Sequence, residues 1–165
     1  NVGTDRDTGA FAVASIRGWW RAEGRHLYPK ARRLLITADG GGSNGSRSRL
    51  WKVALQRLSD TTGLDVCVGH LPPGTSKWNK IDQRLFCHIT ENWRGRPLVS
   101  HEVMVHLMAH TTTETGLRVA AALDPTSYPT GKKVSDDELA HVNVYPAAFH
   151  GDDWNYVIKP SHKNQ

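Results

Sequence analysis

The sequence predicts an α/β fold with parallel strands, and three consecutive segments carry that prediction. Residues 34–38, Leu-Leu-Ile-Thr-Ala, form an apolar run without alternation, which is typical of a strand covered on both faces. Residues 46–63 place apolar side chains at helical spacing and end at a glycine, and residues 64–70 alternate apolar and polar as a second strand does. A strand, a helix and a strand in this order indicate a right-handed crossover with both strands parallel.

The other elements are expected on either side of this unit. Before it come a strand stub at Val2 and a helix capped by Asp7 or Thr8. After it we expect a helix over about 78–93, a helix over 98–110 capped by Ser100, and a short helix opened by the capping box of residues 135–138. The tail from about residue 147 is polar with aromatic residues, and we expect it to be loose.

Length and composition set the class of protein. A chain of 165 residues with 38% hydrophobic and 22% charged residues suits a single domain with its own core. No apolar run approaches the roughly 18 residues of a spanning helix, so we expect no membrane partner and a cytoplasmic location. Cys67 and Cys87 match no zinc pattern and are expected to be reduced.

The formal charge of +5 is unevenly distributed. Residues 1–100 contain 16 Lys and Arg against 8 Asp and Glu, whereas residues 101–165 contain 5 against 8. The first part is therefore the half expected to meet a polyanion, although a solvated basic surface explains the charge alone equally well.

The stretch that follows the first strand, Asp39 and then three glycines, allows two interpretations. Gly40, Gly42 and Gly45 match G-x-G-x-x-G, but no Lys follows Gly45 as a P-loop requires, and no acid closes the next strand. A nucleotide-binding module is thus the weaker alternative. In the favoured interpretation, Asp39 is a metal-binding carboxylate at the carboxyl end of a parallel strand, where open α/β sheets place their ligands.

A second acid strengthens the metal interpretation. In the helix expected from about residue 78, Asp82 shares the apolar stripe of Leu85, Phe86, Ile89 and Trp93, where a carboxylate is costly unless something binds it. A metal ion shared with Asp39 would satisfy both acids, while a favourable place near the positive end of the helix dipole is the alternative. Oxygen ligands of this kind suit Mg²⁺ or Mn²⁺.

Basic and aromatic residues surround Asp82 in the sequence. Phosphate contacts and base stacking by such residues are typical of nucleic-acid binding. The expected DNA-binding residues are Lys77, Trp78, Asn79, Lys80 and Arg84.

Four stretches together resemble a known family. LLITADGGGSNGSRSRLWK, HLPPGTSKWNKIDQRLF, ITENWRGRPL and WNYVIKP are similar to the Rhodopirellula-type, or ISAzo13-like, insertion-sequence transposases of the DDE superfamily. The resemblance extends over nearly the whole chain. It implies a ribonuclease-H-like catalytic core that cleaves and joins DNA strands with two Mg²⁺ ions held by three acids. Matched by motif, Asp39 corresponds to the second acid and Asp82 to the third.

The chain departs from the family pattern in two ways. The third acid of the family is ordinarily Glu, so the Asp82 carboxylate reaches about 1.5 Å less far, a displacement that can cost on the order of a hundredfold in rate. The first acid is expected on a strand upstream of residues 3–8, and neither Asp5 nor Asp7 is assigned that role. We therefore expect a partial ribonuclease-H-like fold that lacks the N-terminal strands of the core, as one partial catalytic domain over residues 1–165.

Together these features predict a transposase catalytic-core fragment that is inactive by itself. Its partners would be transposon ends and target DNA, in the bacterial cytoplasm and on the nucleoid when DNA is bound, with a homo-oligomer left open. The alternatives are a DNA-binding remnant without catalysis and the nucleotide-binding module. The strand over 34–38 is expected to present an unpaired edge, and with it poor stability of the chain alone.

Overall fold

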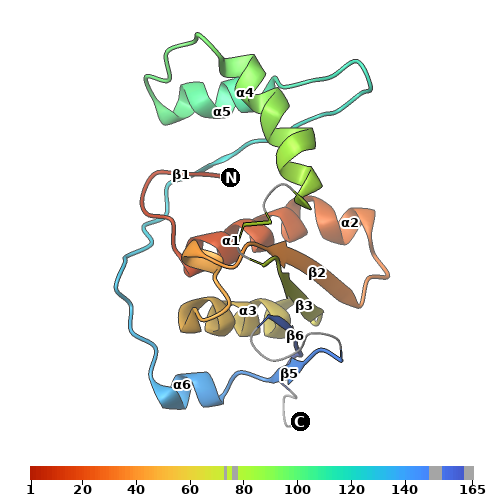
Figure 1. The fold of residues 1–165 in the computed structure, drawn as a ribbon, viewed down its shortest axis with the longest axis vertical. Helices are drawn as coiled ribbons and strands as arrows, with labels where there is room; N and C mark the ends of the chain where they lie inside the picture. Colours follow the sequence, from red (N-terminus) through yellow and green to blue (C-terminus); the bar gives the residue numbers. More distant parts are fainter. Residues whose placement is uncertain (73, 76–77, 149–153, 162–165) are drawn as a thin grey trace. The chain divides into compact units, whose positions relative to one another are not determined.

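The protein is described by a computed structural model that covers residues 1–72, 74–75, 78–148 and 154–161, with the backbone alone at residues 82 and 83 (Figure 1). The chain forms two compact units, and each unit is built from two separate stretches of sequence. Unit 1 comprises Asn1–Arg6 and Gly74–Ser127. Unit 2 comprises Asp7–Pro73 and Tyr128–Gln165.

Unit 2 contains a four-stranded sheet in the order β2-β3-β6-β5. The strands are β2 (Arg33–Ala38), β3 (Asp65–His70), β5 (Val144–Pro146) and β6 (Asn155–Ile158). Strands β2 and β3 are parallel, in a register that runs from Arg33 opposite Asp65 to Ala38 opposite His70. Helix α3 (Arg49–Thr62) connects them, so the predicted strand-helix-strand unit is confirmed. Strand β6 is antiparallel to both β3 and β5.

Two helices cover one face of this sheet. They are α1 (Gly9–Trp19), which Thr8 caps as predicted, and α3, and they enclose the core with the buried side chains of β3 and β6 (Figure 1). The core side chains are Val13, Trp51, Leu55, Leu58, Val66, Val68, Tyr156 and Ile158. Helix α1 continues through the π-helical turn η1 (Trp20–Gly24) into the short α2 (Arg25–Leu27). In α1, Gly9 allows close approach to α3, since a Cβ there would lie 3.1 Å from the Trp51 backbone.

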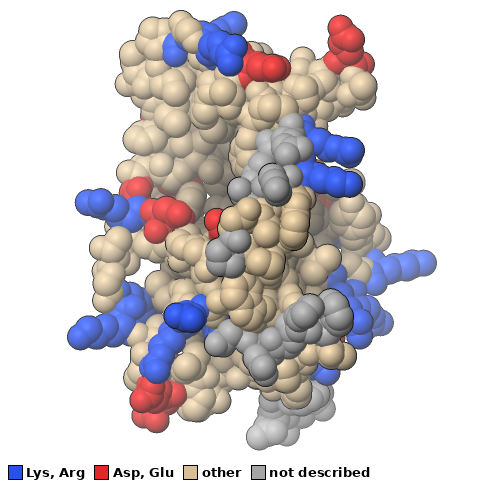
Figure 2. All heavy atoms as spheres, viewed as in Figure 1, with Lys and Arg blue, Asp and Glu red and all other residues tan. Residues whose placement is uncertain are grey.

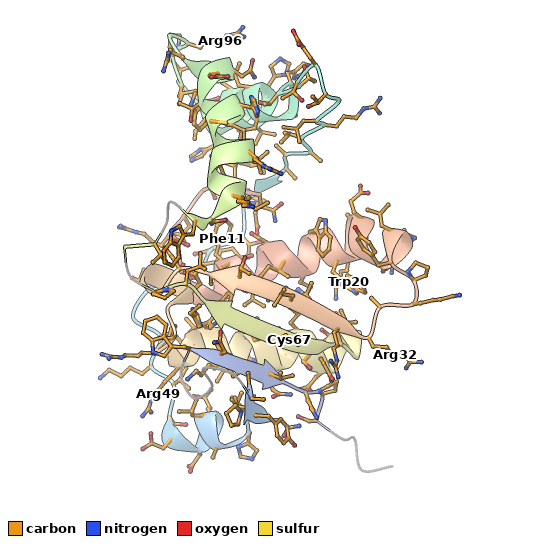
Figure 3. The ribbon with its side chains drawn as sticks, turned by 45° about the vertical axis from the view of Figure 1, so that its right-hand side comes forward. Phe11, Trp20, Arg32, Arg49, Cys67 and Arg96 are labelled. Atoms are coloured by element: carbon orange, nitrogen blue, oxygen red, sulfur yellow. The ribbon has the colours of Figure 1, made fainter. Side chains whose placement is uncertain are left out.

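The prediction that the first strand is covered on both faces is wrong. Burial alternates along β2, whose Leu34 and Ile36 pack against the core while Leu35 is 70% exposed. The reason is that α1 and α3 both lie on the same face, and Cys67 of β3 lies on the other one (Figure 3). Within the described residues, β2 pairs with β3 alone, so its outer edge is unpaired.

Helix α3 begins and ends where its sequence provides caps. The Ser48 side chain accepts a hydrogen bond from the Trp51 backbone N–H, and Gly63 closes the helix with a φ of 73°. This left-handed conformation costs a residue with a Cβ about 1–2 kcal/mol.

We expect Gly63→Ala to lower the free energy of unfolding of unit 2 by about 1 kcal/mol, measured by urea denaturation. The same change at Gly41, where an added Cβ would meet nothing within 4 Å and φ is not positive, is the matched control.

The predicted loose tail from about residue 147 is wrong for residues 155–158. They form β6, an inner strand of the sheet, with Tyr156 at 1% and Ile158 at 0% exposure. The alternation in this short strand places two large side chains in the core, which outweighs the polar character of the neighbouring residues. Just before β5, the predicted capping box of Ser135 and Glu138 is confirmed and opens α6 (Asp136–Ala140).

Unit 1 consists of helices and one small sheet. Its elements are β1 (Val2–Gly3), η4 (Asp82–Phe86), α4 (Cys87–Trp93), α5 (His101–Ala109) and β4 (Leu123–Asp124). Strands β1 and β4 pair in parallel. Ser100 caps α5 as predicted, and the Asn92 amide of α4 donates to the Leu107 carbonyl of α5. Among the residues that the structure describes, no helix has the length and apolar character to cross a membrane.

The helix expected over residues 78–93 is not a regular α-helix. Its middle, η4, is π-helical and lies between α-helical residues 80–81 and α4 (Cys87–Trp93). A π-turn takes up more residues than an α-turn, so regular α-helical spacing does not continue through η4. Ile89 is buried but Phe86 is 52% exposed, which corrects the predicted apolar stripe.

Candidate active site

Asp39 follows directly on β2 and is exposed. The last pair of the parallel ladder joins Ala38 to His70, so Asp39 lies at the edge of the sheet where both strands end. Beyond that pair, the Leu71 backbone N–H donates to the Ala38 carbonyl at 2.7 Å. Asp39 thus occupies the position at which open α/β sheets place ligand-binding groups.

The loop after Asp39 holds one oxygen of its carboxylate. The loop includes the 3₁₀ turn η2 (Gly42–Asn44), and Gly42 has a φ of 70° that a residue with a Cβ rarely adopts. With its amide nitrogen turned toward two acceptors, Asn44 donates to Asp39 Oδ1 and to the Gly41 carbonyl, both at 3.0 Å. The glycines therefore bring an amide donor to Asp39, a role that the sequence did not reveal.

Several polar groups of the same loop are used within unit 2. The backbone N–H of Gly45 donates to the Gly42 carbonyl at 3.3 Å, and that of Ser48 donates to the Gly45 carbonyl at 2.9 Å. The Ser43 hydroxyl donates to Asp7 at the start of α1. A phosphate cradle requires backbone N–H groups that point outward, and these two N–H groups are already used within the loop.

The second predicted metal ligand lies in the other unit. Asp82 is the first residue of η4 in unit 1, and its backbone alone is described. Asp39 belongs to unit 2, so a metal ion shared by the two acids stays a prediction. Among the side chains that the structure describes, no group of three or more His, Cys, Asp or Glu is arranged to hold a metal ion.

Four of the five predicted DNA-binding residues are described. Trp78 is 63% exposed, and Lys80 and Arg84 are also exposed, as contacts to DNA require. Asn79 is half-buried, and its side-chain oxygen accepts from the Ile81 backbone N–H at 3.3 Å. Lys77 lies outside the described residues. On the face shown in Figure 2, Lys and Arg side chains project from several separate places.

A comparison with protein families decides the identity. Residues 1–160 match the family model of the Rhodopirellula transposase DDE domain, and this range includes all of unit 1 and most of unit 2. The chain belongs to this family. No curated protein and no solved structure matches it.

Membership of the family gives the transposase domain its general chemistry. DDE transposase domains act on DNA and generally use divalent metal ions. Asp39 fits one ligand position of such an ion, because it is an exposed, hard oxygen donor at the carboxyl end of a parallel strand. The sequence alone did not identify Asn44 as a partner of Asp39, nor His70, whose Nδ1 lies 3.1 Å from the Asp39 carbonyl oxygen.

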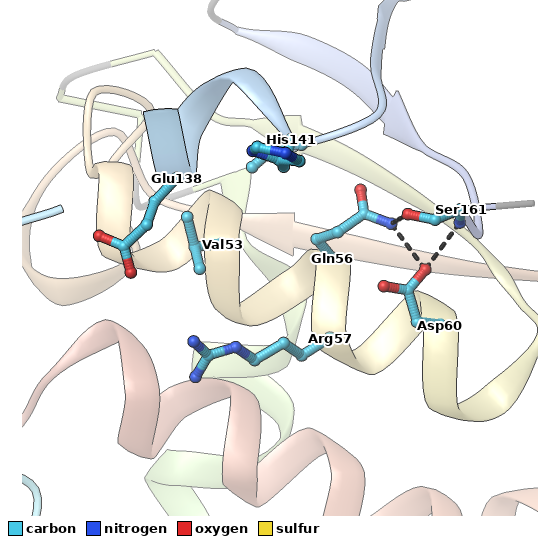
Figure 4. A pocket seen from close by; sticks show the side chains of 8 residues that line it. Val53, Gln56, Arg57, Asp60, Glu138, His141 and Ser161 are labelled. Carbon is cyan, nitrogen blue, oxygen red and sulfur yellow. Dashed lines mark hydrogen bonds between the residues drawn. The ribbon is translucent and has the colours of Figure 1, made fainter. Parts of the chain in front are cut away.

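A pocket of about 310 Å³ lies elsewhere in unit 2 (Figure 4). It is lined by Val53, Gln56, Arg57, Asp60, Glu138, His141, Val142 and Ser161. The Gln56 amide donates to Asp60 at 2.8 Å and to the Ser161 hydroxyl at 3.1 Å, and the Ser161 backbone N–H donates to Asp60 at 2.7 Å. These bonds attach the chain that follows β6 to α3, so the polar groups along one side of the pocket are structural.

Proposed function

We propose that this transposase domain supplies part of the catalytic site for Mg²⁺- or Mn²⁺-dependent cleavage and joining of DNA strands of an insertion sequence. Asp39 and Asp82 would hold the metal ion. The observation that carries the proposal is the exposed Asp39 carboxylate at the end of a parallel strand, in a chain that belongs to a DDE family.

The proposed chemistry consists of two phosphoryl transfers. Water attacks a phosphodiester at a transposon end and releases a 3′-hydroxyl, which then attacks a phosphodiester of the target and displaces its 3′-oxygen. A bound divalent ion would activate the attacking oxygen and stabilise the negative charge on the leaving oxygen. Asp39 would contribute the oxygen that Asn44 does not hold, while Lys77, Trp78, Asn79, Lys80 and Arg84 would contact the DNA backbone and bases.

We also propose that units 1 and 2 together form one partial DDE catalytic domain with a ribonuclease-H-like core. The parallel pair of β2 and β3, joined by α3, supports this fold, as does the outer edge of β2, which has no partner strand among the described residues. A further strand paired with that edge could carry the first acid. The described residues would then provide two of the three acids of the catalytic site. For this reason, we expect the domain alone to be inactive.

The test is nicking of labelled transposon-end DNA with Mg²⁺ or Mn²⁺. It compares the 165-residue chain with the longest reading frame that contains it. Metal-dependent nicking by the longer form supports the proposal. Salt-sensitive DNA binding without cleavage by either form would favour a non-catalytic DNA-binding remnant, which the exposed Trp78, Lys80 and Arg84 would still permit.

The DNA-binding residues give a separate prediction. If Lys80 and Arg84 each contact a phosphate, Ala at either position lowers the slope of log affinity against log salt by about 1. Affinity falls for all DNA sequences alike. Fluorescence anisotropy over a salt series measures this slope. Lys132→Ala, another exposed Lys outside the motif, is the matched control, and an equal loss there would indicate a general charge effect.

A further inference from the structure

A chain of hydrogen bonds runs from the core of unit 2 to the backbone of Asp39. Trp51 Nε1 donates to the Tyr156 hydroxyl at 3.0 Å. The Tyr156 hydroxyl lies 3.3 Å from His70 Nε2, and His70 Nδ1 lies 3.1 Å from the Asp39 carbonyl oxygen. Three elements contribute to this chain, since Trp51 belongs to α3, Tyr156 to β6 and His70 to β3.

The chemistry of the two end groups fixes the direction of the bonds. The indole N–H of Trp51 can only donate, and the carbonyl of Asp39 can only accept. In a neutral imidazole, His70 therefore carries its proton on Nδ1 and donates it to Asp39, while Nε2 accepts from the Tyr156 hydroxyl. In the other neutral tautomer, Nδ1 has no proton. Two acceptors, Nδ1 and the Asp39 carbonyl oxygen, would then face each other, and the carbonyl would lack this donor.

Because its side chains are buried, this chain of hydrogen bonds favours one position of the Asp39 backbone. Trp51 and Tyr156 are each 1% exposed and His70 is 5% exposed, so water does not readily replace a missing partner. A buried polar group left without its partner costs about 1–3 kcal/mol. The ladder of β2 and β3 ends at Ala38 and His70, and the His70 side chain extends the hold by one residue, to Asp39.

Asn44 acts on the other side of the same residue. It donates to Asp39 Oδ1, so the His70 ring holds the main chain and Asn44 holds one carboxylate oxygen. Together these contacts restrict both the position and the rotation of the carboxylate. A metal ligand gains affinity when its geometry is fixed before the ion binds.

We infer that His70, supported by Tyr156 and Trp51, and Asn44 are positioning residues for the Asp39 carboxylate. This inference rests on the proposed function, because it takes Asp39 as a metal ligand. It assigns a role to the buried His and to the Asn of the glycine loop.

The test follows binding of Mn²⁺ to the full chain. Paramagnetic broadening of the Gly40 and Gly41 amide signals in NMR spectra gives an apparent affinity at Asp39. Loss of a hydrogen bond that supports a metal ligand typically weakens binding 10-fold to 100-fold, and we expect about tenfold for Tyr156→Phe and for Asn44→Ala. Asn44 is half-buried outside the core, so its variant remains informative if Tyr156→Phe does not fold.

Two comparisons separate positioning from general stability. At residue 70, Asn places its amide nearer the position of Nδ1 than Gln does, so His70→Asn should retain more Mn²⁺ affinity than His70→Gln. Ser59→Ala removes another buried hydroxyl, which donates to the Leu64 carbonyl at the opposite end of β3, and should leave Mn²⁺ affinity unchanged. The ¹⁵N shifts of His70 should indicate a proton on Nδ1.

The outcomes distinguish the inference from the proposed function. If Mn²⁺ broadens the Gly40 and Gly41 signals of Asp39→Asn as much as those of the unchanged protein, Asp39 is not a ligand, and both proposals are overturned. If Asp39→Asn abolishes the broadening but the Tyr156, His70 and Asn44 variants bind Mn²⁺ normally, the positioning role alone is overturned. A His70 proton on Nε2 would contradict the direction of the hydrogen-bond chain.

Discussion

Asp39→Asn is expected to reduce metal-dependent DNA nicking by on the order of a thousandfold in the longest active form of the transposase. The substitution keeps the shape of the side chain and the acceptor oxygen that Asn44 can reach, but it removes the negative charge that we propose binds the ion. A loss of about 4 kcal/mol of transition-state stabilisation corresponds to that factor. Single-turnover nicking with excess enzyme measures the chemical step directly.

Two controls make this result specific to the metal site. Asp137→Asn removes one negative charge from the exposed side of α6 and should leave nicking within about twofold, as for most surface substitutions. DNA affinity of Asp39→Asn, measured in the absence of divalent ions, should not fall. Undiminished nicking by Asp39→Asn would mean that Asp39 is not part of the catalytic site.

Ile158→Ala is expected to lower the free energy of unfolding of unit 2 by about 2–5 kcal/mol. Ile158 is fully buried among the core side chains, so truncation removes apolar contacts and leaves a cavity. A loss of this size is a large part of the stability of a small domain. Urea denaturation, followed by tryptophan fluorescence, measures the change because Trp51 lies in the same core.

The control for this prediction is the residue paired with Ile158 in the sheet. Val144 of β5 lies opposite Ile158 and is 37% exposed, so Val144→Ala should cost no more than about 1 kcal/mol. Equal and small effects of the two substitutions would mean that residues 155–158 do not pack into the core. The loose tail predicted from the sequence would then be the better description.

Local signals in the sequence were enough for the central crossover of unit 2 and for helix starts in both units. The crossover of β2, α3 and β3 follows from apolar spacing and from Gly63, and Thr8, Ser100 and Ser135 cap helices as their side chains predict. These features depend on residues within a few positions of one another. Asp39 could be placed at the end of its strand for the same reason.

Features that depend on distant partners were not predictable. Strand β6 has only four residues, and its place in the sheet comes from pairing with β3, about 90 residues earlier. The exposure of Leu35 depends on which face α1 covers. The π-helical turn at Asp82 changes the helical phase without any proline or glycine to mark it, so regular spacing could not locate a metal-binding stripe there.

The predicted DNA contacts show the same limit. The exposed Trp78, Lys80 and Arg84 agree with the sequence pattern, but exposure is common for such residues and does not identify a partner. In contrast, the hydrogen bonds of Asn44 and His70 to Asp39 required a folded loop and a sheet edge to become visible. Their roles could not be deduced from residue type alone.

The interrupted sequence of unit 2 has a consequence for synthesis of the protein. Residues 74–127 of unit 1 are inserted between β3 and the strand that completes its sheet. During translation, α1, β2, α3 and β3 emerge before residues 74–127, and β6 can pair with β3 only after this insertion and the following elements have been made. Closing so long a loop is slow, so the growing chain would expose the apolar side chains of β3 for longer than a contiguous domain does. Chaperone dependence during expression would be the practical sign of this delay.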